Sequence, residues 1–404
     1  MIGNKFNTDF KFVKIAVGLL FSLVMFPSNL KSIVIFISGI IIVTYFFRNK
    51  RKFQKRYFLL NGTIFLLLLG TILYSNNLEY AFKKLQTLAS LIVFPLFFSV
   101  LNYDDKKELN LSITKYLKLY IISVFLFNII PFLWFYITNY TFSEILQHFK
   151  FIIIVDFGKY TIHPIYMSMH CCLAIIFSMV IFSKLKRKSE KFLHIIINVI
   201  LLLFVLLYAK KGPIIAFLLT ITVWFYFEYK KHFKYNLLIV LGLIIFFAII
   251  PTTRKHFLEL ANIEKVTVDN PTSTNIRYTI YQNSFSLIKK SLFWGYGIGD
   301  YNDELRKTFK KNAPFLSEKS YNSHNQYISF TLIGGLGLLI SFLIFYGKNL
   351  MIALQSNNIY LILILIFYGV MMFFENILER EHGVIFFSLF LNFFAFNKVI
   401  KPKE

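Results

Sequence analysis

The chain has 404 residues, of which 57% are hydrophobic and 16% charged, and its formal net charge is +24. Soluble proteins carry about 25% charged residues, so this composition excludes a soluble domain and predicts an all-α bundle of membrane-spanning helices. The basic residues are dispersed between apolar runs, which argues against nucleic acid as a partner. The two cysteines, Cys171 and Cys172, are neighbours, so we expect neither a disulfide framework nor a cysteine zinc site.

Apolar runs in chain order predict about 12 transmembrane helices in a single integral membrane domain, residues 1–404. No small-residue cleavage site follows the first run, so no cleaved signal peptide is predicted. Several runs are shorter than the roughly 20 residues of a typical span. We expect the polar residues that flank these runs to extend the helices inside the bundle. The runs cover 12–27, 32–47, 58–75, 88–102, 113–138, 164–183, 192–208, 212–228, 237–251, 326–346, 359–375 and 383–397.

The lysines and arginines orient these spans. They concentrate in alternate connections such as "RNKRKFQKR" and "KLKRKSEK", and are sparse in the other short connections. The positive-inside rule therefore predicts that the N- and C-termini are both cytoplasmic. The same rule assigns 139–163, 208–213, 375–381 and one large extracytoplasmic loop, 252–325, to the outer face. Nearly all polar segments that could be functional are thus predicted to lie on the outer side of the membrane.

A very tight outer turn, "YAKKGP", holds Lys210 and Lys211 between two apolar runs. One interpretation is that both lysines snorkel to the interface at little cost. Lysine is disfavoured on the outer face, however, and two lysines in a minimal turn also fit an anion-binding role. Phosphate or diphosphate is the natural ligand for such a pair.

The segment "HPIYMSMH" starts the sixth predicted helix, with Pro164 suited to the first helical position. His163 and His170 are seven residues apart, so a helix places them on one face, and Cys171 follows. No outer acidic residue or histidine has a matching spacing. We therefore favour neutral, hydrogen-bonded histidines and predict no metal site.

The large outer loop contains one segment with helical periodicity, 274–292. Its apolar residues follow a 3-4-3-4 spacing and predict an amphipathic helix. These residues are Tyr278, Tyr281, Phe285, Ile288 and Leu292. Arg277 lies off this stripe, so it is either a solvated residue of an interfacial helix or a side chain turned toward the mouth of the bundle.

A glycine-rich stretch, "FWGYGIGDY", follows this helix with Gly295, Gly297 and Gly299 in alternation. No strand precedes it, so it is not a dinucleotide-binding fingerprint. It could present backbone N–H groups to an anion. A tight return toward the membrane is the interpretation we favour.

The outer loop ends in "YNSHNQYISFTLIGGLG", where His324 and Asn325 stand at the start of an apolar run. Asn325 suits a helix cap, and an ionisable histidine beside it suits chemistry at the membrane surface. The glycines that follow are expected to let neighbouring helices approach closely. They are Gly334, Gly335 and Gly337.

The last outer turn, "ENILEREHG", carries Glu375, Glu379 and Arg380. The two glutamates are four residues apart and share a face if the segment is helical. The turn is then either a solvated loop with an intrahelical Glu–Arg pair, or it supplies a carboxylate. Such a carboxylate would orient an acceptor hydroxyl or pair with a cation that binds substrate.

In their order and sidedness, these motifs resemble the O-antigen ligase and O-antigen polymerase superfamily of polytopic membrane glycosyltransferases. The resemblance spans about 160–395 and rests on the Ala209–Gly212 turn, Arg277, "WGYGIG" and "HNQYISFTLIGGLG". The segments "HPIYMS" and "ENILERE" are similar to one branch. Where the family turn has a Ser-Arg motif, this chain has lysine, which keeps the charge but lacks the bidentate fork.

The resemblance implies an enzyme of the bacterial cytoplasmic (inner) membrane that joins undecaprenyl-diphosphate-linked saccharides on its outer face, without metal or other cofactor. It implies His324 and Arg277 as catalytic residues, and Lys210, Lys211 and Arg277 as ligands of the donor diphosphate. The acceptor would be a lipid or another glycan, and other polysaccharide-assembly proteins are candidate partners. Candidate acceptor-binding residues are Asn325, His163, Tyr166, Glu375 and Arg380.

Two alternatives remain at this stage. A polymerase and a ligase share these features, and the lysine turn favours the polymerase slightly. A flippase for lipid-linked oligosaccharides, or another twelve-span transporter, would fit the span count. It should bury charges along its spans, however, whereas these spans are nearly free of charge.

Overall fold

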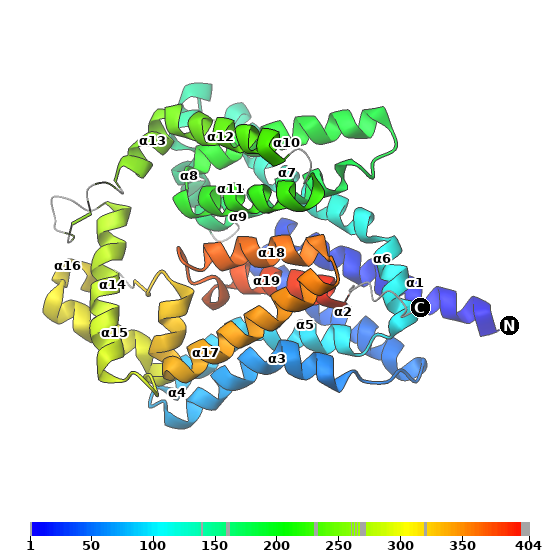
Figure 1. Cartoon of the computed structure of the whole chain (residues 1–404), viewed down its shortest axis with the longest axis horizontal. Helices are drawn as coiled ribbons and strands as arrows, with labels where there is room; N and C mark the ends of the chain where they lie inside the picture. The colour runs from blue at the N-terminus through cyan, green and yellow to red at the C-terminus, as the bar shows by residue number, and fades with distance from the viewer. Residues whose placement is uncertain are drawn as a thin grey trace. The chain divides into compact units, whose positions relative to one another are not determined.

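A computed structural model describes residues 2–138, 140–158, 162–229, 233–259, 261, 263–264, 266, 272–318 and 321–396. Helices account for nearly all of the described structure, and none of the described residues forms a strand (Figure 1). The all-helical prediction is therefore confirmed. Residues 1 and 397–404 lie outside the described residues. The prediction that both termini are cytoplasmic concerns these residues and stays a prediction.

The helices divide into two compact units. The first comprises residues 1–55, 97–240 and 396–403, and the second comprises 56–96, 241–395 and 404. Within the first unit lie α1 (Ile2–Phe21), η1 (Leu23–Met25), α2 (Ser28–Arg48), α6 (Tyr103–Leu111), α7 (Ile113–Thr138), α8 (Phe142–Phe157), α9 (Pro164–Phe182), α10 (Lys188–Tyr208), α11 (Lys211–Glu228) and the start of α12 (Phe233–Ile249).

The second unit is assembled from segments far apart in the sequence. Its elements are α3 (Lys55–Gly70), η2 (Thr71–Tyr74), α4 (Leu78–Leu88), most of α5 (Ser90–Ser99), α13 (Pro251–Leu258), α14 (Ser273–Lys290), α15 (Gly297–Asn312), α16 (Pro314–Ser317), α17 (Gln326–Gln355), α18 (Ile359–Met371), η5 (Ile377–Glu379) and α19 (Glu381–Phe396). Within it, α14 and α15 pack on each other and on α17 (Figure 1).

Seven of the described helices are long and apolar enough to cross a membrane, which makes this a multi-pass membrane protein. They are α2, α3 with η2, α7, α9, α10, α11 and α17. An eighth span results if α4 and α5, bent by 41° at their junction, count together. The predicted number of about 12 is not confirmed, because several apolar helices, such as α18 and α19, are only 10–17 residues long.

The core of the first unit is α9, which packs against α7, α10 and α11. Its sequence is apolar on all sides, as expected of a helix surrounded by others, and it is buried along most of its length. Two of its polar side chains form buried pairs: the His170 Nδ1 lies 2.7 Å from the Tyr120 hydroxyl, and the Ser178 hydroxyl lies 2.8 Å from the His194 Nδ1.

In the second unit, α17 is broken at its middle. Gly334 and Gly335 leave helical geometry, and Gly335 has φ +61°, a region that favours glycine. The turn after α14 fills the break: the Tyr296 N–H donates to the Leu332 carbonyl and the Leu336 N–H to the Leu292 carbonyl, both at 2.8 Å. The glycines thus admit a backbone turn, which corrects the expectation of close helix–helix approach.

The amphipathic helix of the outer loop is present as α14, but its buried face differs from the prediction. Tyr278, Phe285 and Leu292 are exposed, and of the predicted stripe Ile288 is the residue that is buried. The face turned to the protein holds Ile280 and Leu287, with small polar residues between them. The 3-4 spacing identified residues that share a face, but the neighbours α15 and α17 accept smaller side chains.

Candidate functional site

His324 stands two residues before the start of α17, in a backbone conformation that the surrounding bonds hold in place. Its φ is +46°, which is uncommon for a residue with a side chain. The His324 N–H donates to the Asn322 Oδ1 at 3.0 Å. The Asn325 side chain caps α17 by accepting from the N–H groups of Tyr327 and Ile328, which confirms that Asn325 suits a cap. These hydrogen bonds at the start of α17 thereby fix the orientation of the His324 side chain.

The imidazole of His324 contacts the carboxylate of Glu375, with 3.3 Å between Nδ1 and Oε2. Because a carboxylate accepts hydrogen bonds, Nδ1 is the donor in this pair, and Nε2 is the ring nitrogen left to face a substrate. The Glu375 side chain is only 9% exposed, whereas that of His324 is 23% exposed. The buried carboxylate thus orients a histidine that solvent can reach.

Positive charge keeps Glu375 ionised despite its burial. Burial by itself raises the pKa of this carboxyl, but the hydrogen bond and charge of His324 and the charge of Arg277 outweigh it. The net result is a pKa below the ordinary value. Arg277 lies on α14, so this helix brings the loop arginine into electrostatic contact with the His324–Glu375 pair.

Tyr281, one turn after Arg277, ties α14 to the same place. Its hydroxyl donates to the His324 carbonyl at 3.3 Å and to the Phe373 carbonyl at 3.1 Å. Burial raises the pKa of Tyr281, and the charge of Arg277 opposes that rise. The phenol therefore stays protonated and acts as a hydrogen-bond donor that holds three chain segments together.

Asn376 joins the His324–Glu375 pair to a second buried carboxylate. Its N–H donates to the Glu375 Oε1 at 3.2 Å, and its side-chain amide donates to the Glu379 Oε1 at 2.9 Å. The Asn376 Oδ1 accepts from the Ser323 hydroxyl at 3.1 Å. One asparagine thus fixes both glutamates relative to the residue that precedes His324.

Glu379 is enclosed by donors from three helices. Lys84 of α4 lies 3.3 Å from its Oε2, and the hydroxyls of Tyr301 on α15 and Ser329 on α17 also donate to it. The carboxylate is almost fully buried. These contacts gather 78–88, 297–312, 321–329 and 373–381 in one place, and these segments were assigned to the outer face or its border by the sequence.

The turn that carries the glutamates is not the helix considered in the sequence analysis. The α18 helix ends at Met371, and only Ile377–Glu379 form a 3-10 turn. Glu375 and Glu379 therefore do not share a helical face, and no intrahelical Glu–Arg pair forms in this described segment. Arg380 follows the turn with an exposed side chain.

Lys210 and Lys211 belong to the first unit, at the start of α11. Ala209 ends α10 in the left-handed conformation, with φ +48°, which makes the reversal as tight as the sequence predicts. Lys210 is the N-cap residue, and Lys211 is the first helical residue and is 7% exposed. Lysine side chains at a helix N-terminus, beside backbone N–H groups, form a surrounding favourable to anions.

His163 and Tyr166 also belong to the first unit. The His163 Nδ1 accepts from the Ile165 N–H at 3.5 Å and caps α9, while its side chain stays exposed. Tyr166 is buried one turn later, with its ring centroid 6.5 Å from that of His163. The His170 Nδ1 contacts the Tyr120 hydroxyl, so this nitrogen is not directed at a ligand common to His163 and His170. Among the described residues, no three His, Cys, Asp or Glu side chains group as a metal site would require.

The glycine-rich stretch forms a tight turn between α14 and α15, and its return toward the membrane stays a prediction. The Ile298 N–H donates to the Thr71 hydroxyl at 3.2 Å and the Gly299 N–H to the Ser75 hydroxyl at 3.1 Å. A Cβ on Gly297 would lie 2.3 Å from the Ser75 Oγ, so the turn needs glycine. These two amides are occupied within the protein and are not presented to an anion.

The second unit thus combines a histidine, an orienting carboxylate and an arginine at one solvent-accessible place. Such a set can accept a proton from a hydroxyl and stabilise a developing negative charge. Sequence reasoning missed Asn376 and Lys84, placed Tyr281 only in an apolar stripe, and named Glu379 as a possible functional carboxylate without its partners. The one available signal was an unusual density of ionisable residues between two apolar runs at 375–382.

Residues 196–343 match the protein family described as O-Antigen ligase. The matched region begins within α10 and contains the lysine turn, Arg277 and His324, whereas Glu375 lies beyond its end. No curated protein matches the chain. This match, over somewhat more than a third of the chain, supports membership of the O-antigen ligase and polymerase superfamily.

Proposed function

We propose that the protein is a glycosyltransferase that joins undecaprenyl-diphosphate-linked saccharides on the outer face of the bacterial cytoplasmic membrane. The observation that carries the proposal is the contact between His324 and the buried carboxylate of Glu375, within the field of Arg277. A carboxylate that orients a histidine is the arrangement of a general base. The matched family supplies the expectation of a lipid-linked glycan.

In the proposed reaction, an acceptor hydroxyl attacks the anomeric carbon of the donor sugar. The new bond is a glycosidic C–O bond, and the bond that breaks joins the anomeric carbon to the lipid diphosphate. His324 Nε2 takes the hydroxyl proton, and Glu375 stabilises the imidazolium that forms. The diphosphate leaves with the electron pair, and Arg277, with Lys210 or Lys211, stabilises its charge.

Two substitutions test the assignment of roles. His324→Ala should lower the rate of glycan joining by about 10²- to 10⁴-fold, the usual contribution of a general base. Arg277→Ala should weaken both donor binding and the rate. Both variants should still insert into the membrane and be expressed. Full-length polysaccharide in a deletion strain that carries either variant would contradict the assignment.

We favour the polymerase over the ligase, because the Ala209–Gly212 turn carries lysine where ligase-like turns carry arginine. Purified protein given one lipid-linked repeat unit decides the matter. A ladder of longer products identifies a polymerase, and a product that forms only after another acceptor is added identifies a ligase. Transfer of the substrate between leaflets without a new bond would identify a flippase and would overturn the proposal.

A further inference from the structure

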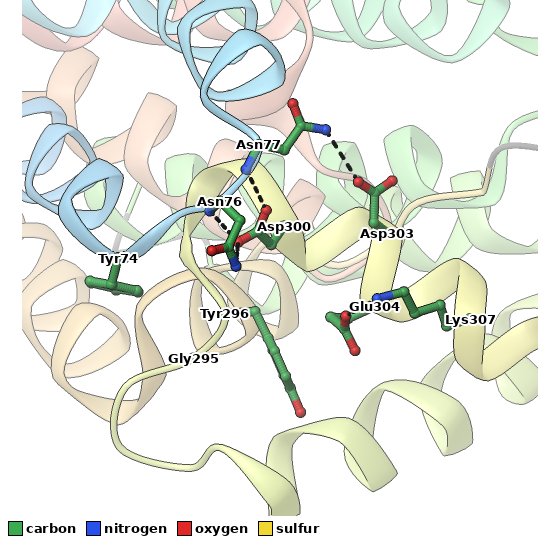
Figure 2. A pocket seen from close by; sticks show the side chains of 9 residues that line it. All are labelled: Tyr74, Asn76, Asn77, Gly295, Tyr296, Asp300, Asp303, Glu304 and Lys307. Carbon is green, nitrogen blue, oxygen red and sulfur yellow. Dashed lines mark hydrogen bonds and ion pairs between the residues drawn. The ribbon is translucent and has the colours of Figure 1, made fainter.

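A polar cavity lies in the same unit, on a different face of α15 from the one that contacts Glu379. It has a volume of about 550 Å³ and is bounded by the first turns of α15 and the connection between η2 and α4 (Figure 2). Tyr301 on one face of α15 bonds Glu379, whereas Asp300, Asp303, Glu304 and Lys307 on another face line the cavity. The cavity is therefore separate from the His324 site, although both are held by one helix.

Hydrogen bonds between distant parts of the chain fix the walls of this cavity. The Asp300 carboxylate accepts from the N–H groups of Asn76 and Asn77, at 2.7 and 2.9 Å. The Asn77 side-chain amide donates to Asp303 at 3.3 Å, and Lys307 pairs with Glu304 at 2.6 Å. Figure 2 shows Asp300 and Asp303 directed at the Asn76–Asn77 segment. A preformed site of this size lies within the range of small-ligand pockets, about 300–1,000 Å³.

The charge of the cavity restricts its ligand. Asp300, Asp303 and Glu304 outnumber Lys307, so the cavity is negative within a chain of formal charge +24. A diphosphate would be repelled here. A metal ion is disfavoured as well, because the oxygens of Asp300 are engaged by backbone N–H groups, and no described set of three ligating side chains groups as a metal site would require.

The donors and acceptors of the cavity instead match a hydroxyl-rich ligand. Carboxylates accept hydrogen bonds, the lysine ammonium donates them, and the amide of Asn76 does both. Each hydroxyl of a sugar both donates and accepts. Most ligand pockets are predominantly apolar, whereas polar side chains dominate this lining, with the aromatic residues Tyr74 and Tyr296 beside them.

We propose that this cavity is a subsite for an uncharged saccharide, a part of the glycan away from the bond that forms. The inference rests on the proposed function for its choice of a glycan, but it assigns a position and a charge preference that the proposed function does not contain. The subsite would hold the chain while His324 acts on another part of the substrate.

The test measures binding separately from joining. The probe is the neutral oligosaccharide released by mild acid from the lipid-linked donor, titrated into the purified full chain in nanodiscs and followed by saturation-transfer-difference NMR. Asp303→Ala and Lys307→Ala should each weaken binding of this oligosaccharide by about tenfold, the effect of one charge-assisted hydrogen bond. Glu79→Ala, an exposed charge on the neighbouring α4, should leave binding unchanged.

Lys307 is largely exposed, so its variant tests the inference even if Asp303→Ala fails to fold. Loss of binding in the cavity variants but not in Glu79→Ala supports the subsite. Absence of saturable binding, equal binding by all variants, or binding that chelation with EDTA abolishes would overturn it. Joining is assayed in parallel: protein that binds the oligosaccharide but joins no donor contradicts the proposed function and leaves the subsite standing.

Discussion

Replacement of Glu375 by Gln tests the central contact of the site, because it preserves the shape of the side chain and removes its charge. In the native protein the carboxylate accepts from the His324 Nδ1–H at 3.3 Å and lies in the field of Arg277. A hydrogen bond to a charged group contributes about 1.5–3 kcal/mol. Since about 1.4 kcal/mol is a factor of ten in rate, Glu375→Gln should lower kcat/KM about 10- to 100-fold.

The assay is product formation from lipid-linked donor by purified protein in nanodiscs, as a function of substrate concentration. Glu318→Gln is the matched control, because Glu318 is an exposed glutamate of the same unit. It should retain the native rate. A Glu375→Gln protein that joins glycans as fast as the native protein would show that His324 needs no orienting carboxylate, and the proposed general base would lose its support.

The same substitution has a pH-dependent effect on stability. The folded protein lowers the pKa of Glu375 below its ordinary value of 4.5, so its ionised form stabilises the fold. This contribution is fully present above the ordinary pKa and is lost as the pH falls through the lowered value. The difference in Tm between native protein and Glu375→Gln in detergent should therefore be largest near neutral pH and shrink below about pH 4.5. A difference independent of pH would contradict this reasoning.

Three further predictions concern the second unit. Gly335→Ala should destabilise the protein by about 2 kcal/mol or more, because the added Cβ would lie 2.1 Å from the Phe293 carbonyl oxygen and the φ of this residue is +61°. Gly337→Ala is the control: its added Cβ would have no atom within 4 Å, so Tm should be nearly unchanged. Lys84→Met should cost about 3–5 kcal/mol in chemical unfolding by stranding the buried carboxylate of Glu379, and Lys84→Met with Glu379→Gln should cost less than the sum of the two single changes. Trp294, 76% exposed, should be quenched more strongly by brominated lipid than by aqueous iodide once the other two tryptophans are replaced by Phe; the reverse order would place it in water.

The helices with long apolar runs were predictable because length and composition decide them. The run at 164–183 became α9 (Pro164–Phe182), and the run that starts at residue 326 became α17, which also starts there. The shorter runs were harder to judge. A helix such as α18, 13 residues long, is apolar enough for a span but shorter than the bilayer core, and sequence alone does not distinguish it from a buried core helix.

The face of α14 was not predictable from periodicity. Its stripe of Tyr278, Phe285 and Leu292 is as apolar as a core face, but these side chains are exposed. In a membrane protein, the protein interior and the lipid phase accept the same side chains. The pattern therefore indicates a two-sided helix without indicating which side the protein covers.

Of the candidate site, the sequence predicted the residue types better than their partners. His324 and Glu375 are 51 residues apart, and their pairing follows from how α17 begins and how α18 ends. The link from Asn376 to Glu379 and on to Lys84 depends on contacts across almost 300 residues. No local pattern carries such information, because each of these residues alone resembles an ordinary polar residue of a loop or helix end.

The break in α17 divides one transmembrane element into two mechanically distinct halves. Residues before Gly334 are tied to the His324 site, whereas those after Gly335 continue as a regular apolar helix to Gln355. A helix adapts to bilayer thickness by tilting. The ladder of hydrogen bonds within α17 is interrupted between the halves, and the turn after α14 bridges the break through the Leu292 carbonyl and the Leu336 N–H. A change in the tilt of the second half would therefore reach the His324 site through this turn and α14, and not through a continuous helix.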